Sequence, residues 1–198
     1  MNYRTNEDKL CSTRFSNYNE LINVEDLSED SGPVTEPATL QEVKDYMRLE
    51  GFNSDDSPGT EMDFDNELIE DLIIEARMWI EKITGIHLVP KRLQVTFCNG
   101  NGMIELPGPV QGGITITGDI TTAEYVGTQF PKVKTQGNEI VATYAAGYNY
   151  GTVPPWAKNA IKAYVADHYE YRGDDAPPAA NQRAAQKCRP YKRISAWA

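Results

Sequence analysis

Cysteine and histidine are scarce in this sequence. The 198 residues include 3 cysteines and 2 histidines. Cys11, Cys98 and Cys188 are odd in number and far apart, which fits neither a disulfide framework nor a zinc site and favours a reducing compartment. His87 and His168 lie in different predicted elements and form no paired-ligand motif. We therefore expect no cofactor and no metal ion.

Long hydrophobic runs are also lacking. No apolar stretch approaches the roughly 20 residues that a membrane-spanning helix needs, so we expect no membrane partner. The start of the chain is polar and mixed in charge, from which we expect no signal peptide. Hydrophobic residues still make up 40% of the chain and aromatic residues 10%. This is enough to form a core and excludes disorder along the whole length.

Basic residues are in deficit. The 19 lysines and arginines oppose 29 aspartates and glutamates, a formal net charge of −10. Such an acidic chain is a poor candidate for tight binding of nucleic acid, because phosphate contacts need Lys and Arg. The charge is uneven, since residues 1–36 carry 3 basic and 8 acidic side chains whereas residues 172–198 carry 6 basic and 2 acidic ones. This contrast indicates a separate partner for the basic end.

Composition divides the chain into three segments. Residues 1–38 form an acidic, polar N-terminal arm, which we expect to be disordered or loosely draped, with scattered apolar residues that allow docking on a partner. Residues 39–173 form the main domain, and residues 174–198 form a basic C-terminal tail.

Three helices are predicted in the main domain, at about residues 39–50, 65–84 and 154–172. Thr39 and Glu42 have the spacing of a capping box, and Gly51 is a natural end for the first helix. Asp63 or Asp65 caps the second helix. The second helix has an apolar stripe at steps of three and four residues: Leu68, Leu72, Ala76, Ile80 and Ile83. Ile69 and Ile73 widen this stripe, and Trp79 extends it.

A β region follows the second helix, at about residues 91–146. Apolar and polar residues alternate from Leu93 to Phe97, as in a half-buried strand. Asn99-Gly100 is a hairpin signal, and Met103–Leu106 is the return strand. Two further short strands with glycine turns around them are predicted at Ile114–Ile116 and Ala123–Val126. The predicted fold class is α+β: a core of three main helices, a small antiparallel β-rich insertion between helices two and three, and extended terminal arms.

No catalytic constellation is found. Asn99–Gly102 is rich in glycine but lacks the Lys-Ser/Thr of a P-loop, so we interpret it as a turn. Cys98 has no basic neighbour that would activate it as a nucleophile. The acidic run from Glu61 to Glu81 is typical of a solvated helix face. We expect a binding or structural protein and no enzyme, with a small enzyme of unrecognised site as the remaining alternative.

The order of four motifs resembles that of the head–tail connector proteins of tailed phages, also called adaptor or head-completion proteins. The resemblance covers about residues 38–173. Its motifs are Thr39–Leu49 for the opening helix, Leu68–Gly85 for the second helix, Tyr144–Tyr148 with Val153–Ile161 for the junction before the third helix, and His168–Arg172 for the end of that helix.

The resemblance implies a structural subunit of a phage neck. It implies a homo-oligomeric ring, typically of twelve copies, which binds below the portal, joins the head to the tail and lines the DNA channel. Its partners are then further copies of itself, the portal protein, the tail or the next neck protein, and double-stranded DNA that passes without tight binding. Its location is the neck of the virion, after synthesis in the host cytoplasm.

An acidic channel wall suits such a ring, because it repels the DNA backbone within roughly 8–10 Å, the Debye length. We expect four acidic residues of the second helix to face the channel, the alternative being that they face solvent outside: Glu67, Glu70, Asp71 and Glu75.

The basic and aromatic tail is predicted to dock on the portal, with strand addition as one mode. The alternatives are a disordered tail, or a DNA-binding or packaging accessory protein that uses this tail to contact phosphates. The predicted docking residues are Arg183, Lys187, Arg189, Tyr191, Lys192, Arg193, Ile194 and Trp197.

Overall fold

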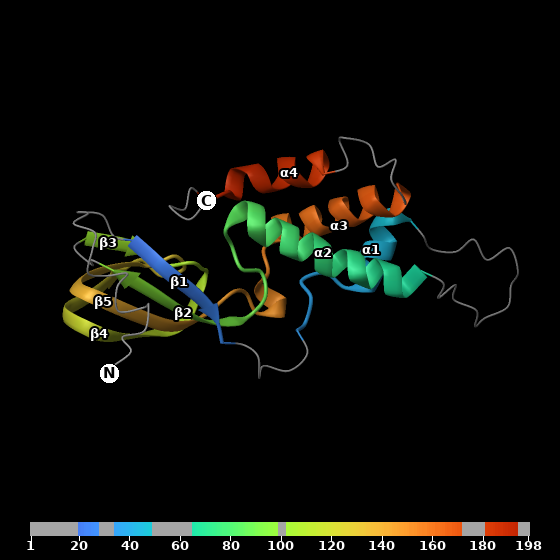
Figure 1. The fold of residues 1–198 in the computed structure, drawn as a ribbon. Coiled ribbons are helices and arrows are strands. Elements are labelled where there is room, and N and C mark those ends of the chain that lie inside the picture. Colours follow the sequence, from blue (N-terminus) through green and yellow to red (C-terminus); the bar gives the residue numbers. More distant parts are fainter. Residues whose placement is uncertain (1–19, 28–33, 49–64, 99–101, 172–180, 194–198) are drawn as a thin grey trace, which may run out of the picture. The chain divides into compact units, whose positions relative to one another are not determined.

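A computed structural model describes residues 20–27, 34–48, 65–98, 102–171 and 181–193. The chain divides into two units, one built of strands and one built of helices (Figure 1). The β unit includes Pro90–Tyr148 and a strand near the N-terminus, and the helical unit includes Val34–Val89 and Asn149–Arg193. The α+β class predicted from the sequence is confirmed.

The β unit is an antiparallel sheet with β5 at its centre. β2 and then β3 pair along one edge of β5, β4 pairs along the other edge, and β1 lies outside β2. The strands are β1 (Glu20–Asp26), β2 (Lys91–Cys98), β3 (Gly102–Glu105), β4 (Val110–Val126) and β5 (Lys132–Ala146).

The hairpin predicted at Asn99-Gly100 is wrong. A hairpin would pair the following strand with β2, whereas β3 pairs with β5. Cys98 lies opposite Glu139, and Gly102 lies opposite Thr135. β2 and β3 therefore run in the same direction along β5 and keep one register. The length of β5 provides partners for both strands, which a local turn signal does not reveal.

β4 is one strand of 17 residues, where the sequence predicts separate strands at Ile114–Ile116 and Ala123–Val126. Register shifts between Gln111 and Ile114 and beside Gly118 disturb the pairing with β5 without ending it. Gly118 has a φ of +116°, which glycine adopts at bulges without a steric penalty. Gly112, Gly113 and Gly118 therefore lie at irregularities within a continuous strand and not in turns.

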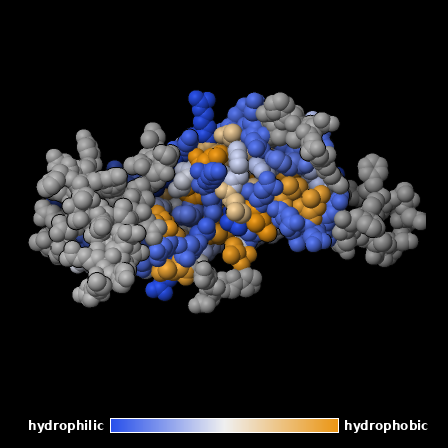
Figure 2. Space-filling model, viewed as in Figure 1, coloured by the Kyte–Doolittle hydropathy of each residue, from blue (hydrophilic) through white to orange (hydrophobic). Residues whose placement is uncertain are grey.

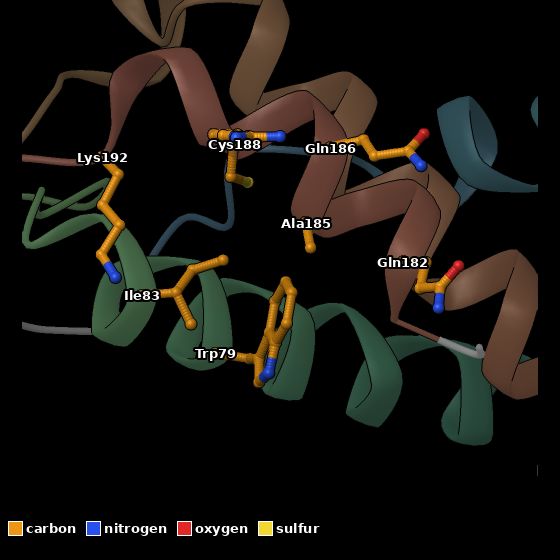
Figure 3. A pocket seen from close by; sticks show the side chains of 8 residues that line it. Trp79, Ile83, Gln182, Ala185, Gln186, Cys188 and Lys192 are labelled. Atoms are coloured by element: carbon orange, nitrogen blue, oxygen red, sulfur yellow. The ribbon is translucent and has the colours of Figure 1, made fainter. Parts of the chain in front are cut away.

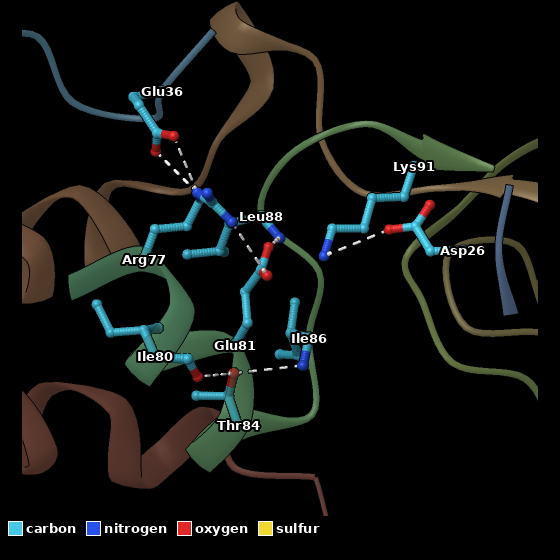
Figure 4. A network of polar contacts seen from close by, with 9 residues as sticks. All are labelled: Asp26, Glu36, Arg77, Ile80, Glu81, Thr84, Ile86, Leu88 and Lys91. Atoms are coloured by element: carbon cyan, nitrogen blue, oxygen red, sulfur yellow. Dashed lines mark hydrogen bonds and ion pairs between the residues drawn. The ribbon is translucent and has the colours of Figure 1, made fainter. Parts of the chain in front are cut away.

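β1 comes from the segment expected to be a polar arm. It pairs antiparallel with β2, from Glu20 opposite Cys98 to Asp26 opposite Leu93. Lys91 Nζ also lies 3.9 Å from Asp26 Oδ2 (Figure 4). The backbone partner of this part of the arm is thus the chain's own sheet. Its acidic composition did not indicate a strand, yet an edge strand tolerates charged side chains because its outer positions stay in water.

The apolar core of the β unit follows the alternation predicted for β2. Leu93, Val95 and Phe97 are all buried. The Tyr144 hydroxyl donates a hydrogen bond to the Pro107 carbonyl at 2.8 Å, which satisfies its polar group at the edge of the cluster. The other buried members of the cluster are Leu106, Val110, Val133, Ile140, Ala142, Tyr144 and Ala146.

The described part of the helical unit contains four α-helices. They are α1 (Leu40–Met47), α2 (Asn66–Thr84), α3 (Pro155–Glu170) and α4 (Gln182–Cys188), with 3-10 turns η4 (Tyr150–Thr152) and η5 (Arg189–Tyr191). α3 contacts each of the other three helices. Ala157, Ala160 and Ile161 on α3 are fully buried, and small residues let neighbouring helices approach closely.

The predicted capping box at the start of α1 is confirmed. The Glu42 amide donates to Thr39 Oγ1 at 3.1 Å, and the Thr39 amide donates to Glu42 Oε2 at 3.1 Å. The helix ends at Met47, because Arg48 adopts a left-handed conformation with a φ of +56°. Gly51, the expected end, lies outside the described residues.

The buried face of α2 lies within the predicted stripe, but one predicted residue, Leu68, is not part of it. Leu68 is 38% exposed, whereas Ile69, Ile73, Ala76 and Ile80 are buried. α3 and α4 both pack against α2, and at its N-terminal end burial falls on the side of the stripe that contains Ile69 and Ile73.

The two ends of α2 differ in how they are capped. Asp65 is the N-cap residue but makes no side-chain capping bond. Its Oδ2 instead accepts a hydrogen bond at 2.6 Å from the Tyr169 hydroxyl on α3. Gly85 ends the helix with a φ of +68° and donates its amide to the Glu81 carbonyl. The N-terminal end of α2 is thus held by a tertiary contact.

Candidate functional site

The candidate functional surfaces of the helical unit begin with the exposed face of α2. Glu67, Glu70, Asp71 and Glu75 all lie on this face and are exposed. Glu75 Oε1 also accepts a hydrogen bond at 2.8 Å from the hydroxyl of Tyr164. Burial and this hydrogen bond both raise the pKa of Tyr164. Exposure is compatible with the predicted channel-facing role of these carboxylates, which stays a prediction.

Apolar side chains interrupt the acidic face. Ile74 is 40% exposed and Met78 is 59% exposed. They are four residues apart, so they lie next to each other on the helix surface. We call Ile74 and Met78, with Asp71 and Glu75 beside them, the α2 ridge. Apolar residues are visible among hydrophilic ones on the face of the molecule shown in Figure 2.

The described part of the basic tail packs on its own helical unit. Ala184 and Cys188 of α4 are buried, and α4 contacts α3 and α2. Arg183 pairs with Oδ1 of Asp167 on α3. Asp167 is only 4% exposed, and among the described residues its Oδ2 has no hydrogen-bond partner. Arg183 therefore supplies the charge that neutralises a buried carboxylate.

Two further predicted docking residues also have contacts within the unit. The ring of Tyr191 stacks on the ring of Trp156 at a centroid distance of 4.4 Å. The Arg193 amide donates to the Thr84 carbonyl at 3.0 Å, and burial lowers the pKa of the Arg193 guanidinium. These contacts hold the segment after α4 against α2 and α3.

The remaining predicted docking residues divide between exposed and undescribed positions. Lys187, Arg189 and Lys192 are exposed. Ile194 and Trp197 lie outside the described residues. Strand addition does not apply to Gln182–Cys188, because these residues are helical. Portal docking by the tail stays a prediction.

A groove of about 370 Å³ runs between α2 and α4 (Figure 3). Trp79 and Ile83 on α2 point toward Ala185 and Cys188 on α4. Its polar lining residues are Gln182, Gln186, Arg189 and Lys192. Burial raises the pKa of the Cys188 thiol to about 11, so this thiol is protonated at neutral pH. The groove thus has an apolar floor with cations near one end.

A buried polar network stabilises the C-terminal half of α2 (Figure 4). Arg77 Nε donates to Glu36 Oε2 at 2.8 Å, and a second guanidinium nitrogen donates to Glu81 Oε2 at 3.5 Å. Glu81 Oε1 accepts the Leu88 amide at 2.7 Å. Arg77 is only 9% exposed, so it does not offset the charge of the acidic face.

His168 is packed between a ring and an amide. Its ring stacks on Tyr164 at a centroid distance of 4.2 Å, and its Nε2 lies 2.8 Å from Asn181 Oδ1. Within the described ranges, no group of three or more His, Cys, Asp or Glu residues could hold a metal ion. Searching the same ranges finds no helix that is long and apolar enough to cross a membrane.

Sequence reasoning missed the Asp167–Arg183 pair and the groove. Two signals were present. Asp167 lies among the apolar residues of α3, where an acid needs a buried counter-charge. Ala184 and Cys188 are four residues apart, which fits one face of a short helix. The short length of this helix and the Pro- and Ala-rich residues before it concealed the pattern.

The fold is shared with proteins of phage-like particles. No protein-family model matches this chain, and no curated protein matches it. A chain from the solved structure "Neck of empty GTA particle computed with C6 symmetry" is 16% identical, with a TM-score of 0.65, over 87% of this chain and 96% of that chain. A chain from "Virion of native gene transfer agent (GTA) particle" is 17% identical, with a TM-score of 0.62 and the same coverage. The chain therefore has the fold of these particle proteins, in agreement with its resemblance to head–tail connector proteins.

Proposed function

We propose that this protein is a structural subunit of the neck of a phage-like particle. Copies form a ring, typically of twelve, that binds below the portal, joins the head to the tail and surrounds the DNA channel. The protein has no catalytic role in this proposal. It acts in the virion by holding other proteins together and by leaving a path for DNA.

The observation that carries the proposal is the fold, which is shared over 87% of this chain and 96% of a chain from a particle neck computed with C6 symmetry. Four sequence motifs in the order of the connector family support the same role independently. The charge also agrees, because a formal net charge of −10 opposes tight binding of the DNA backbone.

Imaging of the purified protein tests the proposal. We expect closed rings by electron microscopy, either alone or after mixing with the portal protein of the same particle, and co-elution with portal on size exclusion. A protein that stays monomeric and does not bind portal contradicts the proposal. Salt-sensitive binding of duplex DNA by the isolated protein would instead support the alternative accessory role of the basic tail.

Portal contact is proposed for the end of the tail, namely the exposed Lys187 and the residues after Arg193, with Ile194 and Trp197 as apolar anchors. Deletion of residues 178–198 is a poor test, because it also removes α4 from α3. Truncation after Arg193 keeps every described contact of α4 and η5. We expect this truncation to weaken portal binding without lowering the melting temperature, and unchanged portal binding would contradict the tail contact.

A further inference from the structure

We propose that the α2 ridge of one copy docks into the α2–α4 groove of the next copy. This inference rests on the proposed ring, and it names the two surfaces that close the ring. The occupant of the groove is thus a second copy of this chain. Met78 and Ile74 would enter the groove, while Asp71 and Glu75 would meet Arg189 and Lys192 at its end.

The ridge has the composition of a contact surface. A solvated helix face or a wall that repels DNA needs only charged side chains, whereas Met78 is 59% exposed and Ile74 is 40% exposed. Removal of this apolar surface from water would favour association with a partner. The unbranched Met side chain also adapts to an irregular cavity. This contact takes the place of the channel-facing role expected from the sequence for the same helix face.

The groove matches the ridge in polarity and charge. Trp79, Ile83 and Ala185 line its apolar part, and Arg189 and Lys192 lie among its lining residues. Aromatic residues and Arg are the most common anchors of protein interfaces. An acidic and apolar ridge therefore fits this groove. A basic segment would be repelled by Arg189 and Lys192, and a phosphate-rich ligand would find no further cation along the apolar part of the groove.

The position of the two surfaces on α2 favours a ring. Successive helix residues are rotated by about 100°, so the line through Ile74 and Met78 lies about 140° around α2 from the line through Trp79 and Ile83. Each copy thus carries the ridge and the groove on different sides, and a contact between them is head-to-tail. Such a contact propagates and closes into a ring when the rotation allows it.

A symmetric contact between two ridges is disfavoured. It would bring the carboxylates of Asp71 and Glu75 from both copies together, and like charges repel most strongly when water is excluded. The ridge therefore needs a partner of opposite charge. In the described part of the helical unit, the groove provides cations beside apolar residues.

Charge reversal on each side tests the contact. One variant combines Asp71→Lys on the ridge with Glu67→Lys one helical turn before it and leaves Glu75 on Tyr164. The other combines Arg189→Glu with Lys192→Glu in the groove. We expect either variant alone to raise the protein concentration needed for ring formation by roughly tenfold or more. A mixture of the two variants should recover assembly in part. Met78→Ser should weaken assembly without changing any charge.

Matched controls separate the contact from folding and from general charge effects. Lys134→Glu on β5 and Glu124→Lys on β4 each reverse one exposed charge outside the ridge, the groove and the tail, so both should assemble as the unmodified protein does. Melting temperature and circular dichroism establish that each variant is folded. If the unmodified protein forms rings and the ridge and groove variants form them equally well, the contact is wrong while the ring proposal stands. If the unmodified protein forms no ring, even with portal, the ring proposal itself fails.

A cross-link gives a readout that does not depend on assembly strength. Met78→Cys and Gln186→Cys, in a chain whose native cysteines are replaced by Ser or Ala, should form disulfides between subunits and give a ladder of covalent oligomers under oxidation. Glu124→Cys in place of Met78→Cys is the matched control and should give no ladder. A ladder of equal strength from the control would contradict the proposed contact.

Discussion

Arg183 on α4 pairs with the buried carboxylate of Asp167 on α3. The Asp167 side chain is 5% exposed and the Arg183 side chain is 56% exposed. The pair therefore joins a solvent-facing cation to an interior acid. It connects the basic tail to the centre of the helical unit and gives one predicted docking residue a structural role.

Loss of Arg183 should destabilise the helical unit. Arg183→Met leaves the carboxylate of Asp167 buried without a counter-charge, which should lower the free energy of unfolding by about 1–3 kcal/mol, less than for a fully buried pair because Arg183 is half exposed. Urea unfolding measures this change. Lys187→Met on the same helix is the control and should change stability by less than about 0.5 kcal/mol. An equal loss in both variants would show that Asp167 does not depend on Arg183.

Alanine at Gly118 should destabilise the β unit. A Cβ atom there would overlap the carbonyl oxygen of Glu139, and the φ of +116° is one that side chains rarely adopt. We expect Gly118→Ala to cost about 1–3 kcal/mol. Gly113→Ala in the same strand is the matched control, because no heavy atom lies within 4 Å of its Cβ position. Thermal unfolding of both variants should separate them clearly, and similar melting temperatures would refute the steric explanation.

Removal of the α1 capping box should have a moderate effect. Thr39→Ala removes the oxygen that accepts the Glu42 amide, and such caps contribute about 1 kcal/mol. Chemical unfolding should show this loss. Thr39→Ser keeps the hydroxyl and should restore most of the stability. A Ser variant as unstable as the Ala variant would indicate that the methyl group, not the hydroxyl, is what matters.

The Cys188 thiol should make stability sensitive to alkaline pH. Burial raises its pKa from 9.0 to about 11, so the folded state holds this proton more tightly than the unfolded state does. The stabilisation is fully present below about pH 9 and is lost as the pH rises through about 11. At about pH 10 the loss should be about 1 kcal/mol. A comparison of the unmodified protein with Cys188→Ala over this range isolates the effect, and parallel pH profiles would contradict it.

Local sequence signals were reliable where one short segment decides the outcome. Thr39 and Glu42 form their capping box because both partners lie within one helical turn. Leu93, Val95 and Phe97 are buried as their alternation predicts, since side chains of a strand point to opposite faces in turn. The fold class followed from such signals, together with motifs whose order resembles that of a known family.

Local sequence signals gave wrong predictions where a residue far away in the chain determines the pairing of a strand, the burial of a side chain or the partner of a carboxylate. Asn99-Gly100 has a hairpin pattern, but β3 pairs with the long strand β5 and not with β2. Leu68 fits the predicted stripe of α2 but is exposed, because the packing of the helices buries the side of that stripe that contains Ile69 and Ile73. The Asp65 side chain caps no amide, and its carboxylate instead accepts a hydrogen bond from the Tyr169 hydroxyl on another helix.

The sequence by itself determined the α+β class, the capping box of α1, the alternation in β2 and the acidic face of α2, because each depends on residues that are close in the chain. Only the tertiary structure decided that part of the acidic arm is an edge strand, that the basic tail contains a helix held by Asp167, and that a groove lies between α2 and α4. Each of these contacts joins residues far apart in the sequence, and no local pattern specifies which distant partner compensates a charge or covers an apolar face.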